Sequence, residues 1–396
     1  MRVACFLPHF HKNLLPNPFF ILSKELVRRG IKVCVVTPKV YDEPLVEHLD
    51  GIEIFRSRDL YLPLKNFPYP IPIFFFEKAI EKIKHNEIDI LSWHTYHYLH
   101  AAYLPIIKKI IKRPTTLTVL SFPGICWIYP IKWINSVARV YSLSLGKVIL
   151  ETADKIIIDF PHNAVGAKYL GLPEDKLEFI PWGVDCDAFK PMPEVRRNLR
   201  ERYGISDKEI VIGYAGRLVP VKGIDVLISA VYKLLKDGEK VRLLIIGGSF
   251  RCVGGLVNEY EVMARHLLGD KVIITGWVKP QMVPLYWQMA DVAAQPSYAE
   301  SGGGGAMEAS ACGLPVIASR VGGLQDVVKD KHTGFHITPG DVKELYEKLK
   351  LLIKNHQLRK ELGRNARNFI KENFDWSVVT DKYIKLYKSL LNNPKL

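Results

Sequence analysis

Acidic residues are absent from one long part of this 396-residue chain. No Asp or Glu occurs from Ile90 to Leu150, although the whole chain has 41 acidic residues against 55 Lys and Arg, for a net charge of +14. Seven basic residues lie in that stretch: Lys108, Lys109, Lys112, Arg113, Lys132, Arg139 and Lys147. This distribution indicates a surface that attracts phosphates, nucleic acid or anionic lipid. The alternative is the generic basic surface of a Lys-rich protein.

Long hydrophobic runs and paired cysteines are absent as well, and no leader sequence is expected. Apolar runs such as residues 71–76 are short, and none reaches the roughly 18 residues of a membrane-spanning helix. The six cysteines stand singly with no CxxC pair, which argues against a zinc ribbon or disulfide framework and favours a cytoplasmic location. The start, MRVACFLPHF, does not look like a signal peptide and is predicted to be a buried strand.

Segments typical of buried strands alternate with helical segments along the chain. The first half has RVACFLP, IKVCVVTP, IDILSWH, TTLTVLSF and ADKIIIDF, and a second series begins near residue 209 with EIVIGYAGRL, VRLLIIGG, KVIITGWV, ADVAAQPS and PVIAS. This alternation predicts an α/β protein with two doubly wound parallel sheets. A chain of 396 residues is also too long for one ordinary core.

We expect a division near PWGVDCDAFKPMPE, residues 181–194, where proline and glycine interrupt the periodicity. The first domain would span residues 1–185 and the second residues 186–375. The helix in residues 376–396 would pack back toward the first domain. Because ligands of doubly wound folds bind beyond the carboxyl ends of the strands, a cleft between the domains is the expected site.

The stretch AESGGGGAMEASACG, residues 299–313, places Glu300 and Glu308 on either side of four glycines. A helix is predicted from Ala306 to Cys312, so its amino terminus lies in the glycines. Unpaired amides and the helix dipole form an anion site there, and the missing side chains let a phosphate approach the backbone. Glu308 can accept from a vicinal diol, and Glu300 can orient hydroxyls on the far side. The alternative is a flexible loop whose glycines serve only turns.

Several segments together resemble the retaining glycosyltransferases of family four. The resemblance rests on the two glutamates, the following GLPVIAS and VGG, and five segments that stand in family order: IPWGVDCDAFKP, GRLVPVKG, LLIIGG, ITGWV and ADVAAQPS. It covers nearly all of residues 150–396. It implies the GT-B fold, in which two Rossmann-like domains face a central cleft.

The resemblance also implies roles for individual residues. Arg217 and Lys222 would contact the donor diphosphate, Glu308 the ribose, and Glu300 the hydroxyls of the transferred sugar. Fixed cations also make physical sense, because they stabilise the charge that develops on a leaving nucleoside diphosphate. The other donor-binding residues implied are Gly303, Gly304, Gly305, Ala306 and Val278.

The activity implied is transfer of a sugar from a nucleoside-diphosphate sugar to a glycan or lipid-linked acceptor. Substitution would occur on one face with retained anomeric configuration, and an oxygen of the leaving phosphate would take the acceptor proton. The reaction would then need no enzyme nucleophile, no cofactor and no metal. Closure of the two domains would exclude water and favour transfer over hydrolysis.

Two departures from the family pattern keep other functions open. The loop PHFHKNLLPNPFF lacks the usual Gly-Gly pair, and Leu120 stands where many members have a histidine. These departures are compatible with a GT-B binding module that has lost catalysis. A nucleotide-sugar epimerase on the same scaffold is another alternative. Nucleic-acid binding would explain the charge but not the glycines and glutamates, so no nucleic-acid partner is expected.

Two patterns suggest metal ligands but are better explained otherwise. WHTYHYLH contains His94, His97 and His100, and no acidic residue accompanies them. His94 ends a predicted strand and is expected to face the cleft as a catalytic residue, while the other two are expected to be structural. Asp185 and Asp187 formally spell DxD, but Asp187 is predicted to be a helix cap.

Two segments could contact a membrane surface. Residues 60–76 are rich in proline and aromatics. Residues 127–147 are predicted to form a helix, with Trp127 and Trp133 flanking its polar stripe. Trp with Lys and Arg on an amphipathic helix suits a headgroup interface, so we expect peripheral contact with the inner face of the membrane. The alternative is a core helix with ordinary surface cations. The polar stripe predicted on this helix consists of Lys132, Asn135, Ser136, Arg139 and Ser142.

Overall fold

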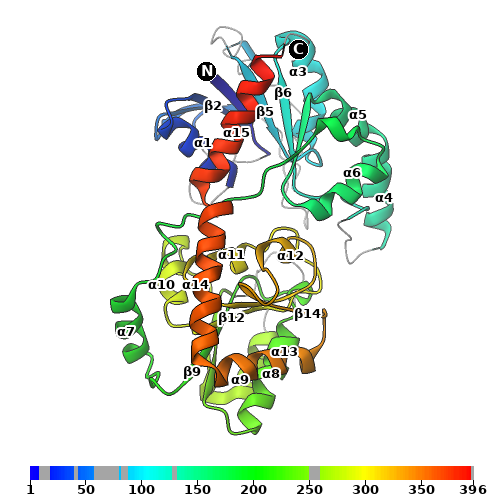
Figure 1. Cartoon of the computed structure of the whole chain (residues 1–396). Coiled ribbons are helices and arrows are strands. Elements are labelled where there is room, and N and C mark those ends of the chain that lie inside the picture. Colours follow the sequence, from blue (N-terminus) through cyan, green and yellow to red (C-terminus); the bar gives the residue numbers. More distant parts are fainter. Residues whose placement is uncertain are drawn as a thin grey trace. The chain divides into compact units, whose positions relative to one another are not determined.

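The computed structural model describes residues 1–8, 18–39, 43–57, 80–81, 88–126, 132–248 and 259–393 (Figure 1). The chain divides into unit 1, residues 1–182 with 376–396, and unit 2, residues 183–375. Residues 60–76, Trp127 and residues 9–17 of the glycine-free loop lie outside the described residues. No helix in the described part of the chain combines the length and apolar character needed to cross a bilayer.

Unit 1 is built on an eight-stranded sheet in the order β3-β4-β2-β1-β5-β6-β7-β8. Every neighbouring pair is parallel except β3 and β4. In register, Val3 lies opposite Val33 on one side and Ile90 on the other. The strands are β1 Arg2–Phe6, β2 Lys32–Pro38, β3 Val46–Leu49, β4 Ile52–Ser57, β5 Ile90–His94, β6 Thr115–Val119, β7 Lys155–Ile158 and β8 Leu177–Phe179.

Alternate residues of these strands face two separate cores. On one face, α1 and α15 pack together, and Arg29 pairs with Asp381 between them. On the other face, α3, α5 and α6 cover the sheet. The helices are α1 Pro18–Arg28, α3 Leu104–Ile111, α4 Lys132–Leu143, α5 Leu145–Thr152, α6 Ala164–Tyr169 and α15 Trp376–Leu391, with 3-10 turns η1 Leu99–Tyr103, η2 Pro161–Asn163 and η3 Glu174–Lys176.

On helix α4 both apolar and polar side chains face the solvent, since Val137 and Val140 are exposed and so are Ser136 and Arg139 of the predicted polar stripe. Ser142, a member of that stripe, is fully buried; its Oγ donates to the Pro123 carbonyl at 3.0 Å and lies 3.0 Å from the Tyr96 hydroxyl. The long predicted helix is also broken, since Ser144 separates α4 from α5. Of the predicted stripe, Ser136 and Arg139 thus lie on the surface, and Ser142 does not.

Unit 2 has a six-stranded parallel sheet in the order β11-β10-β9-β12-β13-β14. Numbered within the unit, this is 3-2-1-4-5-6, the strand order of a Rossmann fold. The strands are β9 Ile210–Ala215, β10 Val241–Ile246, β11 Val272–Ile274, β12 Val292–Gln295, β13 Val316–Ser319 and β14 Gly334–Ile337. Both units are therefore doubly wound α/β domains, which confirms the predicted fold class.

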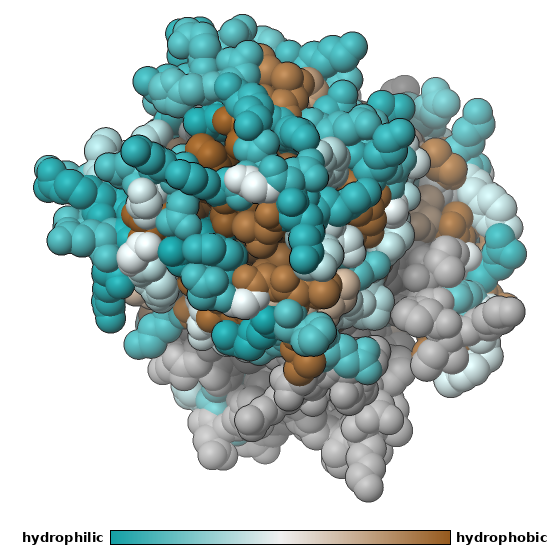
Figure 2. All heavy atoms as spheres, turned by 90° about the horizontal axis from the view of Figure 1, so that it is seen from below, coloured by the Kyte–Doolittle hydropathy of each residue, from teal (hydrophilic) through white to brown (hydrophobic). Residues whose placement is uncertain are grey.

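The helices of unit 2 cover both faces of this sheet, and α8, α9 and α13 gather on one of them (Figure 1). The face drawn in Figure 2 has mainly hydrophilic side chains with hydrophobic groups between them. The helices are α7 Pro193–Arg202, α8 Ile224–Lys236, α9 Glu259–Leu268, α10 Val283–Trp287, α11 Gly304–Ala311, α12 Leu324–Val327, α13 Val342–Lys354 and α14 His356–Asn373, with 3-10 turns η4 Pro220–Lys222, η5 Gly269–Lys271 and η6 Pro280–Met282.

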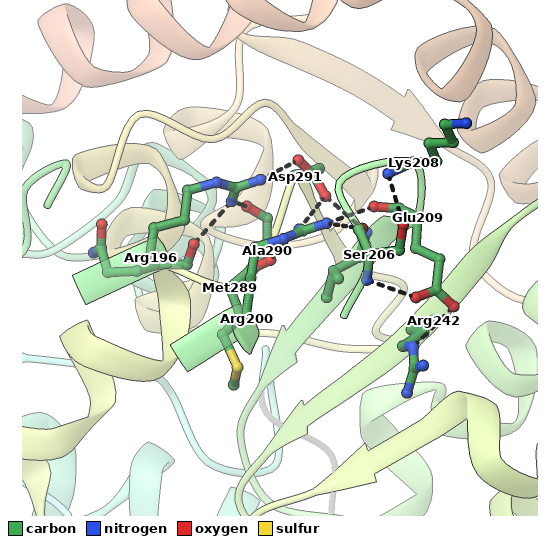
Figure 3. A network of polar contacts seen from close by, with 11 residues as sticks. Arg196, Arg200, Ser206, Lys208, Glu209, Arg242, Met289, Ala290 and Asp291 are labelled. Carbon is green, nitrogen blue, oxygen red and sulfur yellow. Dashed lines mark hydrogen bonds and ion pairs between the residues drawn. The ribbon is translucent and has the colours of Figure 1, made fainter. Parts of the chain in front are cut away.

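A charge network joins α7 to the start of the central strands (Figure 3). Asp291 accepts from Arg196 Nη2 at 2.6 Å, from Arg200 Nη1 at 3.0 Å and from the Val211 amide at 2.8 Å. Arg200 is almost fully buried. This network fixes the amino-terminal ends of β9 and β12, whose carboxyl ends carry the candidate site.

Candidate active site

The motif residues of unit 2 meet at the switch point of its sheet. The strand order reverses between β9 and β12, so the connections that leave these two strands run to opposite faces of the sheet. GRLVPVKG follows β9, and PSYAESGGGG follows β12. Ligands of open α/β sheets bind in the crevice that such a reversal creates beyond the carboxyl ends.

The two loops are held together through their backbones. The Val221 carbonyl accepts from the Tyr298 amide at 2.8 Å and from the Ala299 amide at 3.4 Å. Gly223 has φ +64°, and a Cβ built there would lie 2.0 Å from the Pro296 carbonyl oxygen. A side chain at position 223 would therefore separate the loops, which explains the glycine at the end of the first motif.

Lys222 and Glu300 form an ion pair at the junction of the loops. Lys222 Nζ lies 2.5 Å from Glu300 Oε2, and Ser297 Oγ donates to the same oxygen at 3.4 Å. Both charged side chains are largely buried, with 18% and 12% exposed. Two residues that are 78 positions apart in sequence are thus brought into one charged pair.

The first amides of α11 follow Glu300 at the end of the same loop. Gly303, with φ +75°, precedes the helix, and Gly304 and Gly305 form its first turn. No described residue accepts a hydrogen bond from the Gly304 or Gly305 amide, whereas the Ala306 amide donates to the Gly303 carbonyl at 3.0 Å. The helix begins two residues earlier than predicted from the sequence. Its free first-turn amides are suited to an anion.

Glu308 lies one helical turn after Gly304 and therefore on the same face of α11. Its Oε2 accepts from Trp287 Nε1 at 3.3 Å. Burial raises the pKa of Glu308 from 4.5 to about 7, and the Trp287 hydrogen bond only partly offsets this effect. The carboxyl group therefore changes its charge near neutral pH and gains from any ligand that donates hydrogen bonds to it.

The other two candidate residues of unit 2 flank this core. Arg217 follows β9; its side chain is exposed, and no described residue forms a hydrogen bond or ion pair with its guanidinium. The buried Tyr214 hydroxyl donates to the Arg217 carbonyl at 2.9 Å and so fixes the turn. Val278 follows β11, the edge strand two positions from β9, and is partly exposed.

His94 belongs to unit 1, at the carboxyl end of β5, and is fully buried. Its ring lies 4.1 Å from the Phe19 ring, and its Nε2 lies 3.3 Å from Ser92 Oγ. Burial lowers the pKa of His94 to about 3, so the imidazole is neutral at physiological pH. Leu120 packs its side chain against the core of the same unit.

The other residues whose spacing suggested metal ligands, His97, His100 and the pair Asp185 and Asp187, are explained by their packing and hydrogen bonds within the protein. His100 Nε2 donates to the His94 carbonyl at 3.1 Å, and burial lowers the pKa of His97 to about 4. The cap predicted at Asp187 is wrong: Asp185 Oδ1 accepts from the Asp187 and Ala188 amides, so Asp185 caps this turn. Across the described ranges, no three His, Cys, Asp or Glu side chains are grouped so as to hold a metal ion.

Two supporting residues were not predicted. Trp287, at the end of α10, orients Glu308, and Gln295, the last residue of β12, donates from Nε2 to the Ala215 carbonyl at 3.1 Å beside Gly305. A polar residue that ends a buried apolar strand was an available signal for Gln295, because such positions face the ligand crevice. Nothing in the sequence links Trp287 to Glu308.

Two family models match the chain, one in each half. The model described as Glycosyltransferase Family 4 matches residues 20–188, and the model described as Glycosyl transferases group 1 matches residues 195–369. Together they include most of the chain. The second range contains all the candidate residues of unit 2.

Named relatives cover different shares of the chain. A GDP-mannose-dependent α-(1-6)-phosphatidylinositol monomannoside mannosyltransferase of Mycolicibacterium smegmatis is 34% identical over 52% of this chain and 54% of its own. The alignment thus spans about half the length of that relative. An uncharacterized glycosyltransferase of Methanocaldococcus jannaschii is 25% identical over 93% of this chain and 92% of its own.

Solved structures of similar fold cover both units. A sucrose-phosphate synthase from Thermosynechococcus elongatus has a TM-score of 0.76 at 23% identity and covers 98% of either chain. Anabaena HepE in complex with UDP has a TM-score of 0.75 at 19% identity, over 98% of this chain and 100% of the other. HepE has also been solved with UDP-glucose. These likenesses show that each unit has the fold of a GT-B domain.

Proposed function

Since the chain belongs to the group 1 glycosyl transferases of glycosyltransferase family 4, we propose that it moves a sugar from a nucleoside-diphosphate sugar to an acceptor with retained configuration. The observation that carries this proposal is the grouping of Lys222, Glu300 and the free amides of Gly304 and Gly305 beside Glu308. Cations and amides suit a diphosphate, and carboxylates suit the hydroxyls of sugars. One site thus offers partners for each part of such a donor.

The donor would lie with its diphosphate on the amides of Gly304 and Gly305 and beside Arg217 and Lys222. Glu308 would accept from the two ribose hydroxyls, and Glu300 from hydroxyls of the transferred sugar. Val278, beyond β11, would line the nucleoside end. The UDP and UDP-glucose complexes of HepE and the GDP-mannose named for the mycobacterial relative support a donor of this class.

In the proposed reaction, the bond between the anomeric carbon and the leaving phosphate oxygen breaks while the acceptor oxygen bonds to that carbon on the same face. The acceptor proton goes to an oxygen of the leaving diphosphate. Arg217, Lys222 and the helix amides stabilise the negative charge that grows on this group. These fixed charges are suited to the task without a metal ion, and no cofactor is proposed.

Unit 1 would bind the acceptor, which we propose to be a glycan or a lipid-linked sugar reached from the cytoplasmic side of a membrane. The absence of acidic residues from Ile90 to Leu150 supports an anionic acceptor or surface. His94 does not enter the proposed chemistry as an acid or base, because its ring is fully buried and burial lowers its pKa to about 3, which makes it a weak base. Its proposed role is to shape the carboxyl end of β5.

The first test is a thermal-shift screen with UDP, GDP, ADP and the matching sugar nucleotides. We expect one nucleotide to raise the melting temperature selectively. Glu308→Ala should weaken nucleotide binding, whereas Glu300→Ala should retain it and lower transfer. Equal donor binding and turnover in both variants would refute the assignment. Consumption of the donor without any acceptor would point to an epimerase.

A further inference from the structure

Exposed large apolar side chains gather on one part of unit 1. Of the eighteen such side chains in the described part of the chain, ten lie on helices α3 to α6. Figure 1 shows α3, α5 and α4 following one another along one side of the unit. The ten residues are Ile106, Ile110, Trp133, Val137, Val140, Leu143, Leu145, Val148, Val165 and Tyr169.

Helix α4 is fixed with its apolar side in the solvent. Trp133, Val137 and Val140 recur at helical spacing and are 65%, 59% and 65% exposed. The opposite side is anchored, because Tyr141 Oη donates to the Tyr96 carbonyl at 2.6 Å and Ser142 is buried beside it. A rotation of the helix would break these contacts, so the apolar side needs an external partner.

Helix α3 presents apolar and basic residues on the same side. Ile106, Lys109 and Ile110 stand at i, i+3 and i+4, and all three are exposed. Arg113, which is also exposed, follows the end of the helix. No described residue forms an ion pair with Lys109 or Arg113. Long cationic side chains next to isoleucines suit a surface that is apolar inside and anionic at its edge.

A pocket of about 360 Å³ lies at the carboxyl end of α3, where α5 also ends. Four of its seven lining residues are basic: Lys108, Lys109, Lys112 and Arg113. Its one acidic residue, Asp154, is already paired with Lys108 at 2.5 Å. The pocket lies at the amino-terminal ends of β6 and β7, and is thus remote from the carboxyl ends of the sheet.

We infer that the exposed side of α3, α4 and α5, here called the α3–α5 face, docks on an anionic lipid bilayer. Trp133, Val137 and Val140 enter the interface, and the pocket at the end of α3 receives a phosphate headgroup. The inference rests on the proposed membrane-side acceptor and names the surface and the lipid charge. Charge selects this occupant, because the face combines apolar side chains with unpaired cations. Across α3, α4 and α5 the single acidic residue is Glu151 near the end of α5, which pairs with Lys147 at 3.7 Å.

The test is flotation of the full chain with vesicles of phosphatidylcholine alone or of phosphatidylcholine with the anionic lipid phosphatidylglycerol added. Val137→Asp with Val140→Asp removes the apolar contact, and Val262→Asp with Leu351→Asp on α9 and α13 is the matched control. All four positions are exposed, so folding should be preserved. We expect the first pair to reduce the vesicle-bound fraction roughly tenfold or more and the control to leave it unchanged.

Charge is tested in the same way. Lys109→Glu with Arg113→Glu should reduce binding to the anionic vesicles roughly tenfold, and Arg364→Glu with Lys371→Glu on α14 is the matched control. Free inorganic phosphate at millimolar concentration should not displace the wild type, because the apolar contact requires a bilayer. Equal binding by a variant pair and its control, or equal binding to both vesicle types, would overturn the inference.

Other occupants give other results. If the wild type fails to bind vesicles but forms a dimer that the Val137→Asp, Val140→Asp pair dissociates, the face belongs to a second copy of the chain and the inference is wrong. Donor binding is followed separately by the nucleotide-induced thermal shift, which should be the same in all four variant pairs. A missing shift in the wild type with vesicle binding intact would refute the transfer reaction and leave the docking surface standing.

Discussion

Replacement of Glu308 by glutamine should stabilise the protein at alkaline pH. Burial raises the pKa of Glu308 to about 7 from an ordinary value of 4.5. Between these two pH values the folded chain therefore holds a proton on Glu308 that the unfolded chain has released. Stability from the neutral carboxyl group is complete below pH 4.5 and is lost as the pH rises through 7. Since one pKa unit corresponds to about 1.4 kcal/mol, the ionised group lowers the free energy of unfolding by about 3 kcal/mol above pH 7.

Glutamine keeps the shape of the neutral acid and an oxygen that can accept from Trp287 Nε1. The melting temperatures of wild type and Glu308→Gln should therefore agree near pH 5 and diverge with rising pH. For a unit of this size, 3 kcal/mol corresponds to roughly 6–12 °C at pH 8.5. Calorimetry from pH 5 to 8.5 measures the difference, with the exposed Glu361→Gln on α14 as the control.

The same variant should bind the donor poorly. Ribose hydroxyls donate to an ionised Glu308, so wild-type affinity for the nucleotide sugar should rise with pH through 7, and that of Glu308→Gln should stay low and flat. The diphosphate of a nucleotide sugar does not titrate in this range, which makes it a better probe than a free nucleoside diphosphate. An equal gain in stability at pH 5 and 8.5, or no gain at either, would refute the reasoning.

Three further substitutions test the site and its support. The added methyl group of Gly304→Ala meets open space, so this substitution should leave the melting temperature unchanged while it lowers nucleotide affinity about tenfold. The added Cβ of Gly305→Ala would lie 2.5 Å from Gln295 Nε2, so this substitution should lower the free energy of unfolding by about 1–3 kcal/mol. Lys222→Met should reduce nucleotide affinity by about 1–3 kcal/mol in titration calorimetry, and unchanged affinity would exclude a phosphate role. Asp291→Asn should cost about 3–5 kcal/mol in urea unfolding by leaving buried arginine charge uncompensated, with donor affinity per folded molecule retained.

The alternation of strands and helices could be predicted from the sequence, because parallel strands that are covered on both faces form continuous apolar runs. VRLLIIGG and KVIITGWV became the adjacent strands β10 and β11 in this way. The antiparallel edge strand β3 was not predicted, because Val46–Leu49 carries charge and is only partly buried. At an edge, hydrogen bonding to one neighbour is enough to form a strand without a buried pattern.

The glycines and glutamates of the candidate site could also be predicted from the sequence, but the residues that contact them could not. Lys222 meets Glu300 only because β9 and β12 are neighbours, an order that follows from the whole sheet and not from either motif. Trp287 meets Glu308 through the packing of α10 against α11, and this contact leaves no pattern in the sequence. Local sequence thus identified the residues that we propose to contact a donor, and tertiary structure supplied the residues that lie against them.

Helix α4 shows that periodicity alone does not establish which residues of a helix reach the core. A repeat of 3.6 residues separates an apolar side from a polar side, but it does not state which one faces the core. Here the core side is chosen by two specific hydrogen-bonded residues, Tyr141 and Ser142, which reach Tyr96. Their bonds hold this side of the helix against the core, so Val137 and Val140 remain in water together with Ser136 and Arg139. An arrangement that leaves apolar area exposed lowers the stability of the isolated chain, and contact with an external apolar surface would offset that loss.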